Sequence, residues 1–143
     1  MRISEVIRRK GAAVITIRPD ATVRDLLRVL EENGIGALVV SEDEGATLVG
    51  IVSERDVVRA LHHDGASVLD AQVSALMTAE VATCLPEDDL ESLARVMTER
   101  RVRHLPVVVE GRLKAVVSIG DIVKHRIDEL QAERDQLVDY VHR

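Results

Sequence analysis

The sequence LVGIVSERD at residues 48–56 has a second copy in the chain, LKAVVSIGD at residues 113–121. In both copies an apolar run leads to a serine, and an aspartate follows three residues after the serine. An apolar run rich in Val and Ile is typical of a buried strand, and Ser-x-x-Asp is typical of a helix N-terminus. The pattern therefore predicts a strand that passes directly into a helix, twice in one chain.

The repetition extends well beyond this stretch. Residues 14–42 match residues 81–109 at a constant offset of 67, and the offset falls to 65 after the acidic loop at residues 42–45. A change of length in a loop between two strands is typical of a surface hairpin. We therefore expect two copies of one structural unit.

Each copy predicts the element order β-α-β-β-α. In the first copy a strand at residues 14–17 ends before Pro19, and Thr22 with Asp25 forms a predicted capping box. Apolar residues then follow at i, i+3, i+4 and i+7, as on one face of a helix. Residues 37–40 and 48–52 form a predicted hairpin.

The second copy differs from the first at its helix ends. Asp89 is the predicted N-cap of its first helix. Gly34 is predicted to end the equivalent helix of the first copy as a C′ glycine. Arg101 stands at the matching position of the second copy, so we expect this helix to end differently.

The predicted organisation has five segments. These are an N-terminal helical segment at residues 1–13, a first repeat at 14–63, a linker at 64–77, a second repeat at 78–127 and a C-terminal helix at 128–143. We expect the linker to be partly helical and packed, and the N-terminal helix to pack on the second repeat. Val123, Ile127, Leu130, Arg134, Leu137 and Val141 are spaced as in a coiled-coil seam. This helix would pack on its own module or on a partner subunit.

Composition excludes several classes of protein. The formal net charge is −6 and aromatic residues make up 1% of the 143 residues, which disfavours nucleic-acid binding by bulk charge or by base stacking. Cys84 is the single cysteine, so a disulfide framework and a cysteine-based zinc site are excluded. With neither a signal peptide nor a membrane span in the sequence, we expect a cytoplasmic protein.

Two motifs together resemble a known family. The run VRHLPVV at residues 102–108 and the run GIVSERD at residues 50–56, within a tandem β-α-β-β-α unit, are similar to a CBS-domain pair, named after cystathionine β-synthase. The resemblance implies an α/β (α+β) fold in which two pseudo-symmetric repeats pack sheet to sheet as a Bateman-type module. It also implies homodimers, and adenine nucleotides bound in clefts between the repeats.

The Ser-x-x-Asp junctions are the candidate polar sites. Asp56 could accept hydrogen bonds from both hydroxyls of a ribose, and Ser53 with the first helical turn could hold an anion. Both residues are equally what a helix cap requires, and the resemblance favours nucleotide contact. The second junction has Ser118, Gly120 and Asp121, without a basic residue.

Three residues could bind one phosphate group at the first site. In the family, the segment with Arg103 and His104 faces the junction of the other repeat, so these two residues and Arg55 are predicted to converge. We therefore expect the Asp56 site to be the better nucleotide site. The alternatives are a solvated charge or an ion pair with Glu54 or Glu99 for the arginines, and a partly buried imidazole for His104.

The adenine pockets would have apolar walls. The resemblance and its pseudo-two-fold symmetry place Ile51, Cys84, Leu85, Leu90 and Val102 near the base at the Asp56 site. At the Asp121 site they place Ile17, Arg18, Val23, Ile35, Gly36, Ala37 and Val116 near the base. Any of these residues could instead be plain core.

The sequence contains no pattern that indicates catalysis. It has no nucleophile motif, phosphate-binding glycine loop or metal-ligand spacing, and Cys84 is expected to be a small buried hydrophobe. We therefore expect no enzyme activity, no catalytic cofactor and no metal.

The leading hypothesis is a stand-alone, energy-sensing regulatory module. It would bind AMP, ATP or NAD(H) and signal to a protein partner in trans. The alternatives are a structural dimerisation module without ligand, and a weak nucleic-acid binder that uses Arg101, Arg103 and Arg112.

Overall fold

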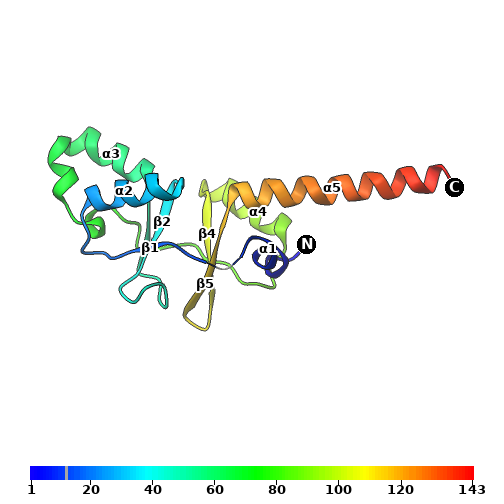
Figure 1. Cartoon of the computed structure of the whole chain (residues 1–143), viewed down its shortest axis with the longest axis horizontal. Coiled ribbons are helices and arrows are strands. Elements are labelled where there is room, and N and C mark those ends of the chain that lie inside the picture. The colour runs from blue at the N-terminus through cyan, green and yellow to red at the C-terminus, as the bar shows by residue number, and fades with distance from the viewer. Residues whose placement is uncertain (12) are drawn as a thin grey trace. The chain divides into compact units, whose positions relative to one another are not determined.

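The computed structural model of the chain describes residues 1–11 and 13–143. Its elements follow one another as α1 (Ile3–Lys10), β1 (Thr16–Ile17), α2 (Val23–Asn33), β2 (Ala37–Val40), β3 (Gly50–Ser53), α3 (Glu54–Asp64), the 3-10 helices η1 (Gly65–Asp70) and η2 (Val73–Ala75), α4 (Leu90–Arg100), β4 (His104–Val109), β5 (Arg112–Ser118) and α5 (Ile119–Val141) (Figure 1). The predicted mixed α/β fold with two repeats and a C-terminal helix is confirmed. The first strand is shorter than predicted, because it begins at Thr16.

The chain divides into two compact units. The first-repeat unit comprises Ala13–Ala82 and Val108–Lys114, and the second-repeat unit comprises the N-terminal segment, Thr83–Val107 and Ala115–Arg143. The predicted packing of sheet on sheet concerns both units together, and it stays a prediction.

The first-repeat unit is built on a three-stranded sheet. Strand β2 lies in the middle, parallel to β1 and antiparallel to β3. Val39 of β2 is opposite Thr16 of β1 and Ile51 of β3. The buried core of this unit is aliphatic and consists of Ile17, Val23, Leu26, Leu30, Leu38, Val40, Val52, Val57, Val68 and Val73. Small branched side chains therefore fill this core without any aromatic ring.

The linker completes the first-repeat unit. Its two 3-10 helices contribute the buried residues Val68 and Val73. The backbone N–H of Val73 donates to the carbonyl of Ala21 at 2.8 Å, and that of Ser74 donates to the carbonyl of Pro19 at 3.0 Å. The predicted helical and packed character of the linker is confirmed.

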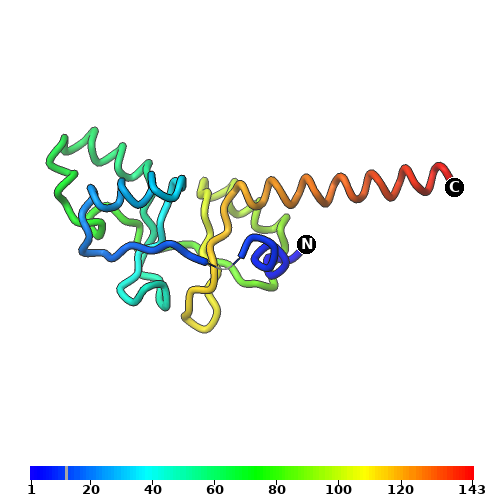
Figure 2. The backbone as a smooth tube through the Cα atoms, viewed as in Figure 1, coloured from blue at the N-terminus to red at the C-terminus, as the bar shows by residue number. Residues whose placement is uncertain are grey.

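The N-terminal helix completes the second-repeat unit in the same manner. Ile3 and Ser4 donate backbone hydrogen bonds to Asp88 at 2.9 Å and to Pro86 at 2.8 Å, and Ile3 is fully buried. Figure 2 shows α1 against the segment that leads into α4. The predicted packing of this helix on the second repeat is confirmed. Each repeat is thus completed by the segment that precedes the other repeat in the chain.

The predicted helix N-caps are present. The side chain of Thr22 accepts a hydrogen bond from the N–H of Asp25, and the Asp25 carboxylate accepts one from the N–H of Thr22, each at 3.2 Å. The Asp89 carboxylate accepts a hydrogen bond from the N–H of Ser92 at 2.7 Å. Polar residues at the N-cap satisfy N–H groups that a helix leaves free, so these two helices start where the sequence predicts.

The expectation that α4 ends differently from α2 is wrong. Arg101 has φ 55° and ψ 41°, and Gly34 has φ 61° and ψ 38°, so both lie in the left-handed region. After Arg101 the N–H of Val102 donates to the carbonyl of Met97 at 3.0 Å, and after Gly34 the same type of bond is formed. Arg101 therefore adopts, at the end of its helix, the conformation that glycine adopts freely.

The C-terminal helix is continuous with the last helix of the second repeat. The sequence predicts a C-terminal helix at residues 128–143 and a seam that already begins at Val123, and α5 runs unbroken over Ile119–Val141 (Figure 1). Ile122 and His125 are its buried residues. The apolar residues of the predicted seam are between 48% and 76% exposed. Of the two predicted alternatives, packing on its own module is therefore not observed, and packing on a partner subunit stays a prediction.

Candidate functional site

The first candidate site is the junction between β3 and α3. The Asp56 carboxylate Oδ2 accepts hydrogen bonds from the backbone N–H of Ser53 at 2.8 Å and from its hydroxyl at 3.1 Å. The N–H of Asp56 in turn points to Ser53 Oγ at 3.4 Å. This is a capping box, so Ser53 and Asp56 do cap α3, as one of the two interpretations of this motif predicts. It uses one carboxylate oxygen, and Oδ1 accepts no hydrogen bond from the residues that the structure describes.

The junction offers an anion fewer N–H groups than the sequence suggests. The N–H of Glu54 donates to the carbonyl of Gly36 at 2.9 Å, and the N–H of Asp56 faces Ser53 Oγ. These donors of the first turn are therefore occupied. The exposed side chain of Arg55 is the basic group at this junction.

The second junction, between β5 and α5, repeats the cap and adds a cation. Asp121 Oδ2 accepts from the N–H of Ser118 at 2.9 Å, and the N–H of Asp121 donates to Ser118 Oγ at 3.1 Å. The Lys10 ammonium lies 2.5 Å from Asp121 Oδ2 and donates to the carbonyl of Val116 at 2.8 Å. The two junctions are therefore alike in their caps and differ in charge.

The charge state of Asp121 reflects this cation. Burial is the largest influence and raises the pKa of this carboxyl. The hydrogen bond and charge of Lys10, with the Ser118 donors, outweigh burial, so the pKa lies below the ordinary value. Asp121 is thus an anion at neutral pH that already has a positive partner.

His104 lies in the same unit, close to this pair. Burial is the main cause that lowers the pKa of His104, and the positive charge of Lys10 adds to it, while Asp121 acts in the opposite direction. The imidazole is therefore neutral at pH 7.

The predicted phosphate-binding residues are distributed over both units. Arg55 belongs to the first-repeat unit, whereas Arg103 and His104 belong to the second-repeat unit. The side chains of both arginines are exposed, and the ion pairs found among the described residues include neither. The backbone carbonyl of Arg103 accepts a hydrogen bond from the N–H of Ile119 at 2.8 Å. The backbone of Arg103 therefore contacts the Ser-x-x-Asp junction of its own repeat. The predicted convergence of the three side chains stays a prediction.

The predicted apolar walls also come from both units. At the Asp56 site, Ile51 belongs to the first-repeat unit and Cys84, Leu85, Leu90 and Val102 belong to the second-repeat unit. At the Asp121 site, Ile17, Arg18, Val23, Ile35, Gly36 and Ala37 belong to the first-repeat unit, and Val116, Ser118, Gly120 and Asp121 belong to the second-repeat unit. Val23 and Leu90 are core residues, whereas Leu85 is exposed.

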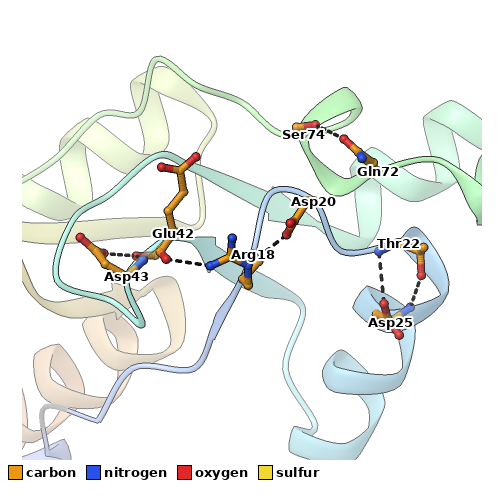
Figure 3. A network of polar contacts seen from close by, with 9 residues as sticks. Arg18, Asp20, Thr22, Asp25, Glu42, Asp43, Gln72 and Ser74 are labelled. Carbon is orange, nitrogen blue, oxygen red and sulfur yellow. Dashed lines mark hydrogen bonds and ion pairs between the residues drawn. The ribbon is translucent and has the colours of Figure 1, made fainter.

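Arg18 already has partners in its own unit. Its Nε lies 3.1 Å from Asp20 Oδ1, and its guanidinium donates to the carbonyl of Glu42 at 2.9 Å (Figure 3). The same view shows the capping box of Thr22 and Asp25. These contacts tie the end of β1 to the loop after β2.

Cys84 has the predicted character of a small buried hydrophobe. It is 5% exposed, and burial raises the pKa of its thiol to about 12, with a smaller contribution from Asp88. Its N–H donates to the carbonyl of Pro106 at 2.9 Å. A thiol with this pKa is not a nucleophile at neutral pH.

Among the described residues, no three His, Cys, Asp or Glu side chains gather as metal ligands would. None of the helices within residues 1–11 and 13–143 combines the length and apolar character needed to cross a membrane.

Lys10 is the residue that sequence reasoning missed. It is separated from Asp121 by 111 positions and belongs to no recognisable motif. The signal that could have revealed it is indirect. The three basic residues Arg8, Arg9 and Lys10 end a helix that is predicted to pack on the second repeat.

Comparison with known proteins places this geometry in a family. The family model described as CBS domain matches residues 3–63 and 73–128. The CBS domain-containing protein CBSX3, mitochondrial, of Arabidopsis thaliana is 33% identical over 146 residues, which cover 97% of this chain and 71% of that protein.

Solved structures agree with the family model. The CBS-domain containing protein ATU1752 of Agrobacterium tumefaciens superposes with a TM-score of 0.84 at 38% identity, covering 88% of this chain and 99% of that one. The CBS domain pair of protein MJ0100, solved in complex with 5′-methylthioadenosine and S-adenosyl-L-methionine, shares the fold with a TM-score of 0.78 at 20% identity, covering 90% of this chain and 98% of that one. Two matched repeats, each with its own hairpin and Ser-x-x-Asp junction, show that this chain belongs to the CBS-domain family and carries two CBS domains in tandem.

Proposed function

We propose that the chain is a regulatory module that binds an adenosine nucleotide and catalyses no reaction. AMP, ATP and NAD(H) are the candidate ligands, and a protein partner would respond to the bound state in trans. We propose the cytoplasm as its location, and we keep the five segments given above as its domain organisation.

One observation supports this function above the others. Asp56 keeps a carboxylate oxygen free beside the start of α3, and Arg55 is exposed one residue before it. A carboxylate suits the hydroxyls of a ribose because it only accepts hydrogen bonds, and a guanidinium suits a phosphate. The adenosine compounds bound to the CBS domain pair of MJ0100 agree with this choice of ligand class.

The test measures binding of AMP, ATP and NADH to the full chain by isothermal titration calorimetry. At least one of these ligands should bind, and Asp56→Asn should abolish binding because the acceptor for the ribose is weakened. Asp25→Asn is the matched control, since Asp25 belongs to the same type of capping box in α2. Loss of binding in both variants would indicate a general effect of the cap, and an absence of binding in the native chain would contradict the proposal.

The two other hypotheses are outcomes of the same set of measurements. A structural dimerisation module would form dimers and ignore all three nucleotides. A nucleic-acid binder would shift RNA in a gel, with a strong dependence on salt, and substitution of Arg101, Arg103 and Arg112 would remove the shift. The net charge of −6 disfavours this last hypothesis.

We also propose that the chain forms a homodimer in which α5 pairs with α5 of a second copy. The seam of Val123, Ile127, Leu130, Leu137 and Val141 is exposed, whereas Ile122 and His125 of the same helix are buried. A heptad spacing of exposed apolar residues is what a second helix with the same spacing complements.

The dimer is tested by measuring molar mass against concentration. Leu130→Gln with Leu137→Gln should weaken association roughly tenfold or more, because each buried leucine contributes about 1.5–3 kcal/mol. Ala132→Gln with Asp139→Gln places the same side chains elsewhere on the helix and should leave association unchanged. A native mass that is monomeric at every concentration would contradict the proposal.

A further inference from the structure

The structure contains a specific difference between the two Ser-x-x-Asp junctions that the repeat itself does not predict. At the second junction the Lys10 ammonium bonds both Asp121 Oδ2 and the carbonyl of Val116. At the first junction no ion pair joins Asp56 to a basic side chain of its own unit in the part of the chain that the structure describes.

The origin of the difference lies in the segments that complete each repeat. Ile3 and Ser4 make the same backbone contacts with the second repeat that Val73 and Ser74 make with the first. The 3-10 helix that begins at Val73 ends at Ala75, whereas α1 continues to Lys10. The longer helix brings its last residue to the second junction.

The carbonyls of Ile51 and Val116 show the same equivalence between the two segments that complete the repeats. Ile51 and Val116 are equivalent at the offset of 65. The carbonyl of Ile51 accepts from the backbone N–H of Thr78 at 2.8 Å, whereas the carbonyl of Val116 accepts from the Lys10 side chain. A backbone bond in one repeat is thus replaced by a side-chain cation in the other.

We propose that Lys10 closes the Asp121 site, so that the chain binds one adenosine nucleotide, at Asp56. This inference rests on the proposed function and specifies which of the two sites is filled. The ammonium bonds Oδ2, the oxygen that the cap already uses, and leaves Oδ1 without a donor among the described residues. Its effect is to neutralise the charge that makes the carboxylate a strong acceptor for ribose hydroxyls.

The energetics favour the lysine over a ribose. A ribose hydroxyl and an ammonium both form charge-assisted hydrogen bonds to a carboxylate, and the ammonium adds the attraction between opposite charges. The Lys10 and Asp121 side chains are 31% and 18% exposed, so solvent screens the pair only in part. A ribose that approached Asp121 Oδ1 would lie beside an ammonium that is held by two acceptors, Asp121 Oδ2 and the carbonyl of Val116. At Asp56 the second donor to Oδ2 is the hydroxyl of Ser53, which can rotate away.

The test counts nucleotide sites per chain by isothermal titration calorimetry, with AMP and ATP as probes. The native chain should bind one equivalent, and Lys10→Met should bind two because the Asp121 carboxylate becomes available. Asp56→Asn should bind none, and Lys10→Met with Asp56→Asn should regain one equivalent. This regained site would be the clearest support, since it appears in a chain whose first site is disabled.

Two controls separate the role of the cation from folding effects. Lys10→Arg keeps a charged donor and should remain at one equivalent. Arg9→Met removes a neighbouring exposed charge of the same helix and should also remain at one. Thermal unfolding of each variant verifies that the chains are folded at the temperature of the titration.

The outcomes distinguish this inference from the proposed function. Two equivalents in the native chain, or one unchanged equivalent in Lys10→Met, would overturn the closure and leave the nucleotide-binding function intact. Weaker binding by Lys10→Met would also overturn it, because Lys10 would then contact the ligand. If no protein in the series binds either probe, the proposed function itself is wrong, and the closure fails with it.

Discussion

Gly34 and Arg101 end their helices in the same left-handed conformation, with φ of 61° and 55°. This conformation is free of steric cost for glycine and costs a residue with a Cβ about 1–2 kcal/mol. The second repeat therefore contains local strain that the first repeat avoids.

We predict that Arg101→Gly stabilises the protein by about 0.5–1 kcal/mol, since the relief of strain exceeds the added entropy of the unfolded chain. Denaturant unfolding monitored by circular dichroism measures the change. Arg100→Gly is the control and should destabilise by about 1 kcal/mol, because Arg100 is helical. Equal effects of the two substitutions would show that the backbone of Arg101 is not strained.

A second prediction concerns the close approach of Gly50 to Met77 and Thr78. A Cβ at Gly50 would lie 2.7 Å from the carbonyl oxygen of Thr78 and 2.9 Å from Met77 Sδ. Gly50→Ala should therefore destabilise the protein by about 1–3 kcal/mol. At Gly36 a Cβ would meet the flexible end of Glu54 at 3.2 Å, so Gly36→Ala should have a clearly smaller effect. Thermal unfolding of both variants tests the order.

The third prediction concerns pH. Burial, followed by the charge of Lys10, lowers the pKa of His104 from 6.5. The unfolded chain therefore binds a proton at a higher pH than the folded chain does. Stability should be unaffected by this group above pH 6.5 and should decrease as the pH falls from 6.5 toward the lowered value.

Urea unfolding at a series of pH values measures this slope. His104→Gln should make the stability curve flatter below pH 6.5, and His63→Gln at the exposed end of α3 should leave the slope as it is. A native slope that survives the His104 substitution would exclude His104 as its source.

The fourth prediction concerns the thiol of Cys84. With a pKa of about 12 and 5% exposure, this thiol should resist a disulfide reagent at pH 8 in the folded protein and react rapidly in denaturant. Ser67→Cys in η1 introduces an exposed thiol that should react at once. Rapid labelling of the native chain would show that the segment around Cys84 opens readily.

Local signals in the sequence are sufficient for most of the fold. Repeated apolar runs and Ser-x-x-Asp pairs predict the strands, the helix starts and the duplication, because these features depend on residues close together in the chain. The prediction was wrong at Arg101, which adopts the left-handed conformation although it has a Cβ. The seam spacing from Val123 to Val141 continues across residue 128, and α5 is one helix over Ile119–Val141.

In the candidate site, too, local sequence signals predict one part and tertiary contacts decide the other. The sequence by itself determined that Asp56 and Asp121 stand at equivalent junctions, since the offset of 65 alone relates them. Only the tertiary structure decided that Asp121 has a cation as its partner, because the segment that completes each repeat comes from another part of the chain. Lys10 reaches Asp121 through a contact between residues 111 positions apart, and the pattern of neighbouring residues does not encode contacts at that separation.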